Sequence, residues 1–275
     1  MSSYKLGINV PLGHEKMKAE EAVTYAKKAG FDSVFFNWSY QNYKIESAME
    51  AAKKENLIVQ SIHAPFNRIN TLWEPCEVTD IALAEQIAGV RVCARIGVPL
   101  MIVHPYIGFV NHNPNEQGLE HFGKIIREAE KLGVKLAFEN VEGEEYLAAI
   151  MKEFGSSPVV GFCWDTGHEQ CYNRGKDMMA LYGDKLFGTH FNDNVGVTGE
   201  DITYHDDLHL LPFDGIVDFK GVMDRIRRHN YNDILSFELT ILNKPNKHTH
   251  DEYAKLDPQD FYNLAFQRAT RVAEL

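Results

Sequence analysis

The chain has 275 residues, of which 44% are hydrophobic, and it carries a formal net charge of −11 at pH 7. Proteins that neutralise many phosphates usually present a basic face, so this acidic balance argues against a nucleic-acid-binding protein. We expect no membrane span and no secretory signal, because no apolar run approaches roughly 20 residues. The four cysteines form no CxxC pair, which favours reduced thiols and a cytoplasmic location.

Short apolar segments alternate with amphipathic segments along the chain. Continuous apolar runs are typical of strands buried on both faces of a parallel sheet. The amphipathic segment 15–30 places Met17, Val23 and Ala26 on one face and ends at Gly30, a typical helix stop. The expected strands are 5–10, 33–38, 58–63, 100–104, 135–139, 159–165, 186–191 and 234–239, and the expected helices are 15–30, 43–55, 78–97, 118–133, 144–154, 176–182, 215–230 and 257–273.

Strict alternation of eight strands and eight helices is typical of a (β/α)₈ TIM barrel. The structural alternative is an open doubly wound sheet, which usually carries a glycine-rich phosphate turn after its first strand. Here the first strand leads into "VPLGH", which is not a GxGxxG motif. No low-complexity linker divides the chain, so we predict one (β/α)₈ barrel domain over residues 1–275.

Ionisable residues stand at the ends of six successive predicted strands, from the third to the eighth. In a TIM barrel these ends meet around one axis and form the active site. A single His or Glu there is usually a hydrogen-bonded or salt-bridged residue, but burying many together costs free energy unless an ion compensates. The presence of ionisable residues at six neighbouring strand ends therefore predicts a metal site. The residues are His63, His104, Glu139, Asp165, His168, His190, Asp193 and Glu238, with Asp207 and His209 in the loop after the seventh strand.

The innermost candidates are Glu139, Asp165, His190 and Glu238, from the fifth to the eighth strands. Three carboxylates and one imidazole form an oxygen-rich set that suits a divalent cation, Mn²⁺ before Mg²⁺ or Co²⁺. Zn²⁺ becomes the preferred ion if more histidines ligate. The other residues either bind further metal ions or hydrogen-bond a polyol substrate. They are His63, His104, His168 and the pair Asp207 and His209.

Seven motifs together carry a resemblance to a known family: "SIHAPF", "IVHPY", "FENVEG", "CWDTGH", "GTHFNDN", "DLHLLPFDG" and "LSFEL". The chain resembles the xylose isomerase-like TIM-barrel superfamily, which includes sugar and sugar-phosphate isomerases and epimerases and apurinic-site endonuclease IV. In its ketose 3-epimerase-like branch, one metal is held by Glu, Asp, His and Glu, which match the four innermost candidates. The resemblance implies that Glu139 and Glu238 also form the acid/base pair, acting on a sugar by proton transfer beside its carbonyl.

The same branch implies substrate contacts for further residues. It has a His three residues after the Asp, matching His168, and a second Glu six residues after the first, for which Glu145 is the candidate. An Arg expected six residues after the metal-binding His is replaced by Gly196. Gly167 is expected to let the chain turn sharply after Asp165. The other expected substrate contacts are His63, His104 and His209, with Trp38 closing the apolar side.

The endonuclease IV branch binds three zinc ions through nine ligands, and every ligand type can be placed here. However, a nuclease needs basic loops to hold DNA phosphates, and these loops are aromatic and mixed. Dehydration of an inositol-pathway keto-intermediate and a sugar-binding barrel without catalysis are further alternatives. We expect a small sugar as the partner, neither nucleic acid nor membrane, and leave a homo-oligomer open. The loop aromatics are Trp38, Tyr40, Phe66, Trp73, Tyr106 and Phe109.

Overall fold

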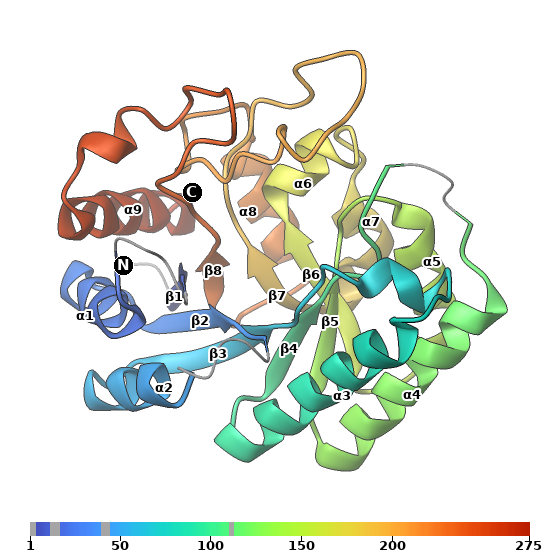
Figure 1. The fold of residues 1–275 in the computed structure, drawn as a ribbon. Helices are drawn as coiled ribbons and strands as arrows, with labels where there is room; N and C mark the ends of the chain where they lie inside the picture. The colour runs from blue at the N-terminus through green and yellow to red at the C-terminus, as the bar shows by residue number, and fades with distance from the viewer. Residues whose placement is uncertain (1–3, 12–16, 40–44, 110–112) are drawn as a thin grey trace.

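Eight parallel strands form a nearly closed barrel with helices between them, which confirms the predicted (β/α)₈ fold (Figure 1). The computed structural model describes residues 4–11, 17–39, 45–109 and 113–275. The sheet order is β7-β6-β5-β4-β3-β2-β1-β8. The strands are β1 Leu6–Val10, β2 Ser33–Asn37, β3 Ile58–His63, β4 Leu100–Val103, β5 Lys135–Glu139, β6 Val160–Asp165, β7 Leu186–His190 and β8 Leu235–Phe237.

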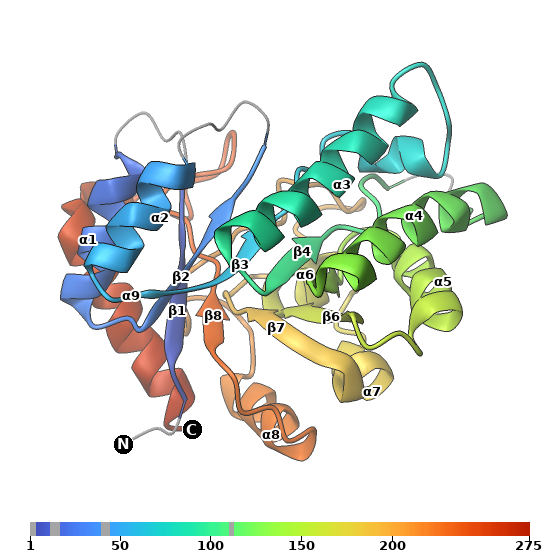
Figure 2. The same cartoon turned by 90° about the horizontal axis from the view of Figure 1, so that it is seen from below.

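The helices surround the strands, with α1, α2 and α9 on one side and α3, α4 and α5 on the other (Figure 2). The α-helices are α1 Ala19–Ala29, α2 Ile45–Lys54, α3 Thr79–Ile96, α4 Glu116–Leu132, α5 Glu144–Phe154, α6 Thr166–Cys171, α7 Met178–Tyr182, α8 Phe219–Arg228 and α9 Pro258–Ala273. The described residues also form three short 3-10 helices, η1 Ile69–Leu72, η2 Gly183–Lys185 and η3 Tyr253–Lys255. Within the described ranges, no helix is both long enough and apolar enough to cross a membrane.

The first and last strands of the sheet, β7 and β8, meet through fewer ladder pairs than the others. Phe191 and Phe237 form an isolated parallel bridge. Beside it, the Ser236 backbone N–H donates to the Thr189 hydroxyl at 2.9 Å. The Thr189 hydroxyl thus accepts a hydrogen bond that a backbone carbonyl would accept in a regular ladder. The barrel therefore closes without a full ladder of backbone hydrogen bonds between β7 and β8.

The barrel interior is layered because side chains alternate along each strand. Small and apolar residues fill one layer, where Leu100, Ile102, Ala137 and Cys163 pack together. Two residues further along β5 and β6, at their carboxyl ends, come Glu139 and Asp165. The larger apolar core lies between the strands and the surrounding helices. The apolar layer thus supports an ionisable layer at the carboxyl ends of the strands.

The predicted elements agree with the structure to within a few residues, with one α-helix added. The expected helices 15–30 and 43–55 correspond to α1 and α2, although 15–16 and 43–44 lie outside the described residues. The expected helix 215–230 begins only at Phe219, after Asp218 caps it by accepting from the Gly221 N–H. The addition is α6, which follows β6 directly and which no pattern in the sequence predicted.

Candidate metal centre

Four ionisable side chains from β5, β6, β7 and the residue after β8 converge at one point. One potential ligand atom from each of Glu139, Asp165, His190 and Glu238 lies within 4.8 Å of the others. The Nδ1 of His190 is 2.9 Å from Glu139 Oε1 and 3.1 Å from Glu238 Oε2. The first three side chains are buried, and Glu238 is 15% exposed. The structure therefore brings together the four residues that the sequence predicted as metal ligands, which we call the quartet.

Asp165 is oriented by hydrogen bonds on both of its carboxylate oxygens. Its Oδ1 accepts the His168 backbone N–H at 2.7 Å, which makes Asp165 the N-cap of α6. Its Oδ2 accepts from the Asn192 side chain at 2.9 Å. The Asn140 side chain holds the Asp165 backbone through two hydrogen bonds, each 2.8 Å long. The three-residue spacing between Asp165 and His168 is thus the spacing of a cap and the helix it begins.

The expected role of Gly167 as a sharp turn is wrong, because this glycine lies inside α6. A Cβ atom at this position would lie 1.9 Å from the Asn192 Oδ1. The residue is glycine because the Asn192 amide, which holds Asp165, occupies the space that any other side chain would need. The motif therefore reflects close packing around the carboxylate rather than a turn.

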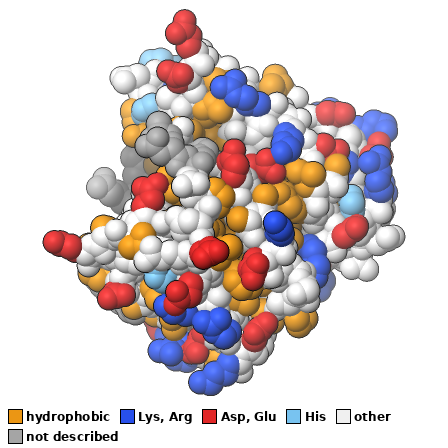
Figure 3. Space-filling model, turned by 90° about the vertical axis from the view of Figure 1, so that its right-hand side faces the viewer, with side chains coloured by type: hydrophobic (Ala, Val, Ile, Leu, Met, Phe, Trp, Pro, Cys, Tyr) orange, Lys and Arg blue, Asp and Glu red, His pale blue; other side chains and the backbone are white. Residues whose placement is uncertain are grey.

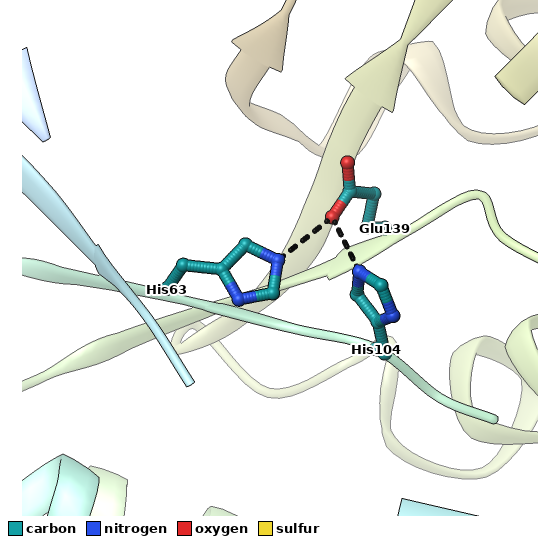
Figure 4. A group of neighbouring side chains, drawn as sticks. All are labelled: His63, His104 and Glu139. Carbon is teal, nitrogen blue, oxygen red and sulfur yellow. Dashed lines mark ion pairs between the residues drawn. The ribbon is translucent and has the colours of Figure 1, made fainter. Parts of the chain in front are cut away.

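A second group joins the quartet through Glu139. The Nε2 atoms of His63 and His104 point to the same oxygen, Glu139 Oε2, at 3.4 and 3.2 Å (Figure 4). His63 also contacts the Ala64 carbonyl oxygen through Nδ1 at 2.8 Å, and that nitrogen must carry the proton because a carbonyl only accepts. The Nε2 of His63 is therefore the ring nitrogen that faces Glu139, where it can pair with the carboxylate or bind a cation.

A third group lies toward the long connection after β7. His209 Nε2 is 2.9 Å and His168 Nε2 is 3.4 Å from Asp207 Oδ1. Both imidazoles donate from Nδ1 to backbone carbonyls, those of Glu238 at 3.0 Å and Asn140 at 3.1 Å. A backbone carbonyl on one ring nitrogen leaves the other nitrogen able to bind a cation once it loses its proton, an arrangement typical of metal-binding histidine. His168, Asp207 and His209 could therefore hold a second cation.

Burial and mutual contact shift the pKa values of these groups strongly. Burial opposes ionisation of Glu139, but His190, His104 and His63 hold its pKa well below the usual range. Burial raises the pKa of Asp165 to about 6. Despite burial, neighbouring carboxylates raise the pKa of His190 well above its ordinary value and that of His209 to about 9. Protons on the imidazoles thus supply the positive charge that balances the carboxylates. A bound divalent cation would supply this positive charge instead.

A cavity of about 550 Å³ opens above the cluster. Four of the predicted substrate contacts, His63, His104, His168 and His209, line it together with Glu238. Phe66 and Phe109 are the predicted loop aromatics found there, whereas Trp73 and Tyr106 are buried in the core and Tyr40 lies outside the described residues. The remaining lining residues are Asn37, Asn67, Asn70, Ile107, Gly108, Glu142, Tyr172, Tyr204, Asp207 and Lys244.

Two predicted substrate contacts do not reach this cavity. Trp38 is buried in the core, and a Cβ added to Gly89 of α3 would lie 3.5 Å from its ring. The prediction is wrong because side chains alternate along β2, so that Asn37 faces the cavity and Trp38 faces α3. Glu145 is exposed in the first turn of α5 and does not line the cavity.

Glu142 lies close to Glu145 in the sequence and lines the cavity in its place, although no sequence motif singled it out. Glu142 is 8% exposed, and burial raises the pKa of its carboxyl group above the ordinary value. It stands three residues after Glu139, in the loop before α5, so "FENVEG" contained the signal. Asp193, by contrast, has a structural role: it accepts backbone N–H groups of Asn194, Phe213 and Val217.

Comparison with known proteins points to one family. The family model described as a xylose isomerase-like TIM barrel matches residues 23–257. An uncharacterized protein, y4fM, of Sinorhizobium fredii is 25% identical over 90% of this chain and 86% of its own length. Inosose dehydratase of Lactiplantibacillus plantarum is 25% identical over 68% of this chain and 61% of its own length.

Solved structures share the fold at low sequence identity. D-allulose 3-epimerase of Methylomonas superposes with a TM-score of 0.70 at 15% identity, covering 99% of both chains. The IOLI protein, solved with a bound zinc atom, superposes with a TM-score of 0.71 at 15% identity, covering 100% of this chain and 98% of its own. A relative of the same fold thus binds a divalent metal, and this chain has groups suited to one.

Proposed function

The chain belongs to the xylose isomerase-like TIM-barrel family, and we propose that it is a divalent-metal-dependent enzyme that isomerises or epimerises a sugar. The observation that carries this proposal is the convergence of Glu139, Asp165, His190 and Glu238 below an open cavity. Three carboxylates with one imidazole suit Mn²⁺, with Mg²⁺, Co²⁺ and Zn²⁺ as alternatives. A sugar epimerase and an inosose dehydratase among the similar proteins support the substrate class.

The reaction requires removal of a weakly acidic proton next to a carbonyl group. The bound cation would supply electrostatic stabilisation of the negative charge that develops on the sugar oxygens. Glu238 lines the cavity, and we assign it the first proton transfer. His63, His104, His168 and His209 also line the cavity, where they would hydrogen-bond and orient the hydroxyl groups.

The two glutamates differ in access, and this difference bears on the reaction type. Glu139 is fully buried and does not line the cavity, because His63, His104 and His190 surround its carboxylate. Moving the carbon-bound proton between neighbouring carbons on one face of the sugar needs Glu238 alone, and His168 or His209, which line the same cavity, would pass the hydroxyl proton from one sugar oxygen to the other. Epimerisation needs Glu139 to reach the opposite face, which this arrangement of side chains opposes. We therefore favour isomerisation over epimerisation.

A phosphodiesterase with three zinc ions is the second candidate. The specific observation in its favour is the grouping of His63, His104 and Glu139 and of His168, Asp207 and His209 beside the quartet. Charge argues against it: of the described lining residues, only Lys244 is a lysine or arginine, and it pairs with Asp207 at 3.2 Å. On the face in Figure 3, acidic and basic side chains are interspersed rather than separated. Neither the cavity lining nor that face therefore offers a continuous basic track for DNA phosphates.

Metal analysis combined with proton exchange tests the proposal. We expect bound divalent metal in the purified protein and, in D₂O with a panel of aldoses and ketoses, deuterium at the carbon beside the carbonyl, detected by NMR. Glu238→Gln should abolish this exchange, whereas Glu50→Gln, an exposed carboxylate on α2, should not. Cleavage of an abasic duplex without sugar exchange would establish the nuclease instead. Loss of water from a keto-inositol would establish the dehydratase.

A further inference from the structure

Four rings form a continuous aromatic series from the metal cluster to the rim of the cavity. The ring centroids of His168 and Tyr172 are 4.8 Å apart, with the planes 29° apart. Tyr172 and Phe109 follow at 5.6 Å, and Phe109 and Tyr204 at 6.3 Å with planes 27° apart. These distances are typical of interacting aromatic pairs. We call the series His168, Tyr172, Phe109 and Tyr204 the aromatic ladder.

The exposure of the ladder increases from its inner to its outer end. His168 is 3% exposed, whereas Tyr204 is 64% exposed, the highest value among the large hydrophobic side chains that are described. The rings come from three separate connections: α6, the segment after β4, and the segment after β7. All four line the same cavity. The exposed outer ring therefore offers an apolar face at the rim of the cavity, where a ligand that extends outward could contact it.

We propose that the aromatic ladder binds the second ring of a glycoside whose keto-sugar ring lies at the metal quartet. This inference rests on the proposed function and specifies its substrate class: a sugar of two rings rather than a free monosaccharide. The cavity of about 550 Å³ lies within the roughly 300–1,000 Å³ of sites that hold drug-sized ligands. The ladder begins at His168, beside the quartet, so a ligand extending outward from the quartet meets it.

The surroundings of the ladder suit a sugar ring better than an aliphatic chain. A pyranose has an apolar C–H face and a rim of hydroxyl groups. Flat aromatic rings provide the matching apolar surface, and tyrosine adds a hydroxyl that donates or accepts hydrogen bonds. Asn67 and Asn70, which line the same cavity, bring amide groups for the hydroxyl rim. A wholly apolar ligand would leave these polar groups desolvated.

The charge of the cavity indicates that this second ring is neutral. Of the described residues that line it, Lys244 is the only lysine or arginine, and its Nζ lies 3.2 Å from Asp207 Oδ2. A phosphate on the second ring would meet the carboxylates of Glu142 and Asp207, which line the same cavity as the ladder, and the one lysine there is already paired. A neutral glycoside therefore fits this cavity better than a sugar phosphate does.

Calorimetric titration of the Mn²⁺-loaded protein with lactulose, maltulose and fructose tests the inference. Each disaccharide ends in the same ketose as the monosaccharide, so the comparison isolates the second ring. We expect one or both disaccharides to bind at least about fivefold more tightly than fructose, the effect of one aromatic contact. Tyr204→Ala should reduce this ratio to near one, while Tyr204→Phe should retain most of it. Leu181→Ala, an exposed apolar residue on α7, is the control that should leave the ratio unchanged.

Equal affinities for the disaccharides and fructose, or no binding of any of the three, would overturn the inference. A ratio that survives Tyr204→Ala and Phe109→Ala would also overturn it, because the ladder would then not be the contact. Failure of the proposed function is detected separately. If the disaccharides bind through the ladder but no deuterium enters any sugar in D₂O, the binding site stands and the isomerase assignment fails.

Discussion

At the scale of single residues, the buried carboxylate of Asp165 shows how the site combines charge with fixed orientation. One oxygen caps α6 and the other accepts from Asn192. Asp165→Asn keeps an oxygen for the cap but removes one negative charge from the quartet and places an NH₂ group against the Asn192 donor. We expect metal affinity to fall at least about 100-fold. Metal content after dialysis, measured by mass spectrometry, checks this, and retention of wild-type affinity would show that Asp165 is not a ligand.

Gly167 extends the same argument to a residue that carries no chemistry. In Gly167→Ala the new methyl group would displace Asn192, whose Oδ1 lies 1.9 Å from the Cβ position. We expect a loss of about 1–3 kcal/mol in the free energy of unfolding together with weaker metal binding. Urea unfolding and metal titration measure the two effects. The matched control is Gly199→Ala, whose Cβ would have no atom closer than 3.7 Å; equal losses in both variants would contradict the argument.

Residue types at strand ends were predictable, but side-chain directions near those ends were predictable only in part. Glu139, Asp165 and His190 each end a strand, so their convergence follows from the barrel alone. Trp38 stands one residue past the end of β2, and the period of two turns it outward. The position of Glu142 depends on the loop before α5, and no periodic pattern describes a loop.

At the scale of elements, strands and long helices were predictable because their apolar periodicity spans many residues. α6 was not, because its six residues cover fewer than two turns and its cap, Asp165, already carried a chemical interpretation. The connections after β7 and β8 were not predictable either. They hold each other through contacts distant in sequence: Lys247 donates to the Thr198 hydroxyl at 2.7 Å, and the Thr240 N–H donates to the His209 carbonyl at 3.2 Å.

The connection after β8 should make stability depend on pH. Burial lowers the pKa of His250 to about 4 from an ordinary value of 6.5, so the unfolded chain binds a proton that the folded chain resists. Above pH 6.5 His250 is neutral in both states and costs no stability. As the pH falls from 6.5 toward 4 the free energy of unfolding decreases, and at pH 5 the loss is about 2 kcal/mol. Urea unfolding at pH 7.5 and pH 5 should show a smaller loss for His250→Gln than for the wild type. Equal losses would contradict the prediction.

At the scale of the whole molecule, the barrel gathers groups that are far apart in the sequence into one buried charge cluster. The order of strands and helices predicted this gathering, because parallel strands in a barrel bring all their carboxyl ends together. It did not predict that the cluster would divide into overlapping groups around Glu139 and a separate group around Asp207. That division depends on which ring nitrogen of each histidine faces the carboxylates, and in His63, His168 and His209 it is Nε2 because Nδ1 donates to a backbone carbonyl. Such choices are made by packing, and sequence spacing does not encode them.

The whole cluster should couple metal binding to pH. Neighbouring carboxylates raise the pKa values of His168 and His190 well above ordinary and that of His209 to about 9. In the metal-free protein these imidazoles are therefore protonated at pH 7, and a cation must displace their protons to reach the same carboxylates. Metal affinity, and with it the stabilisation RT ln(1 + [M]/Kd), should rise with pH.

Thermal melts with Mn²⁺ and with EDTA at pH 6, 7 and 8 measure this coupling. The difference in Tm should widen as the pH rises, since protons replace the cation at low pH and cannot do so at high pH. Calorimetric titration in two buffers of different ionisation enthalpy should show release of protons as Mn²⁺ binds. Asp224→Asn, an exposed carboxylate on α8, serves as the control and should leave the pH trend unchanged. A Tm difference that is constant with pH, together with no proton release, would show that the cation does not enter the imidazole and carboxylate cluster.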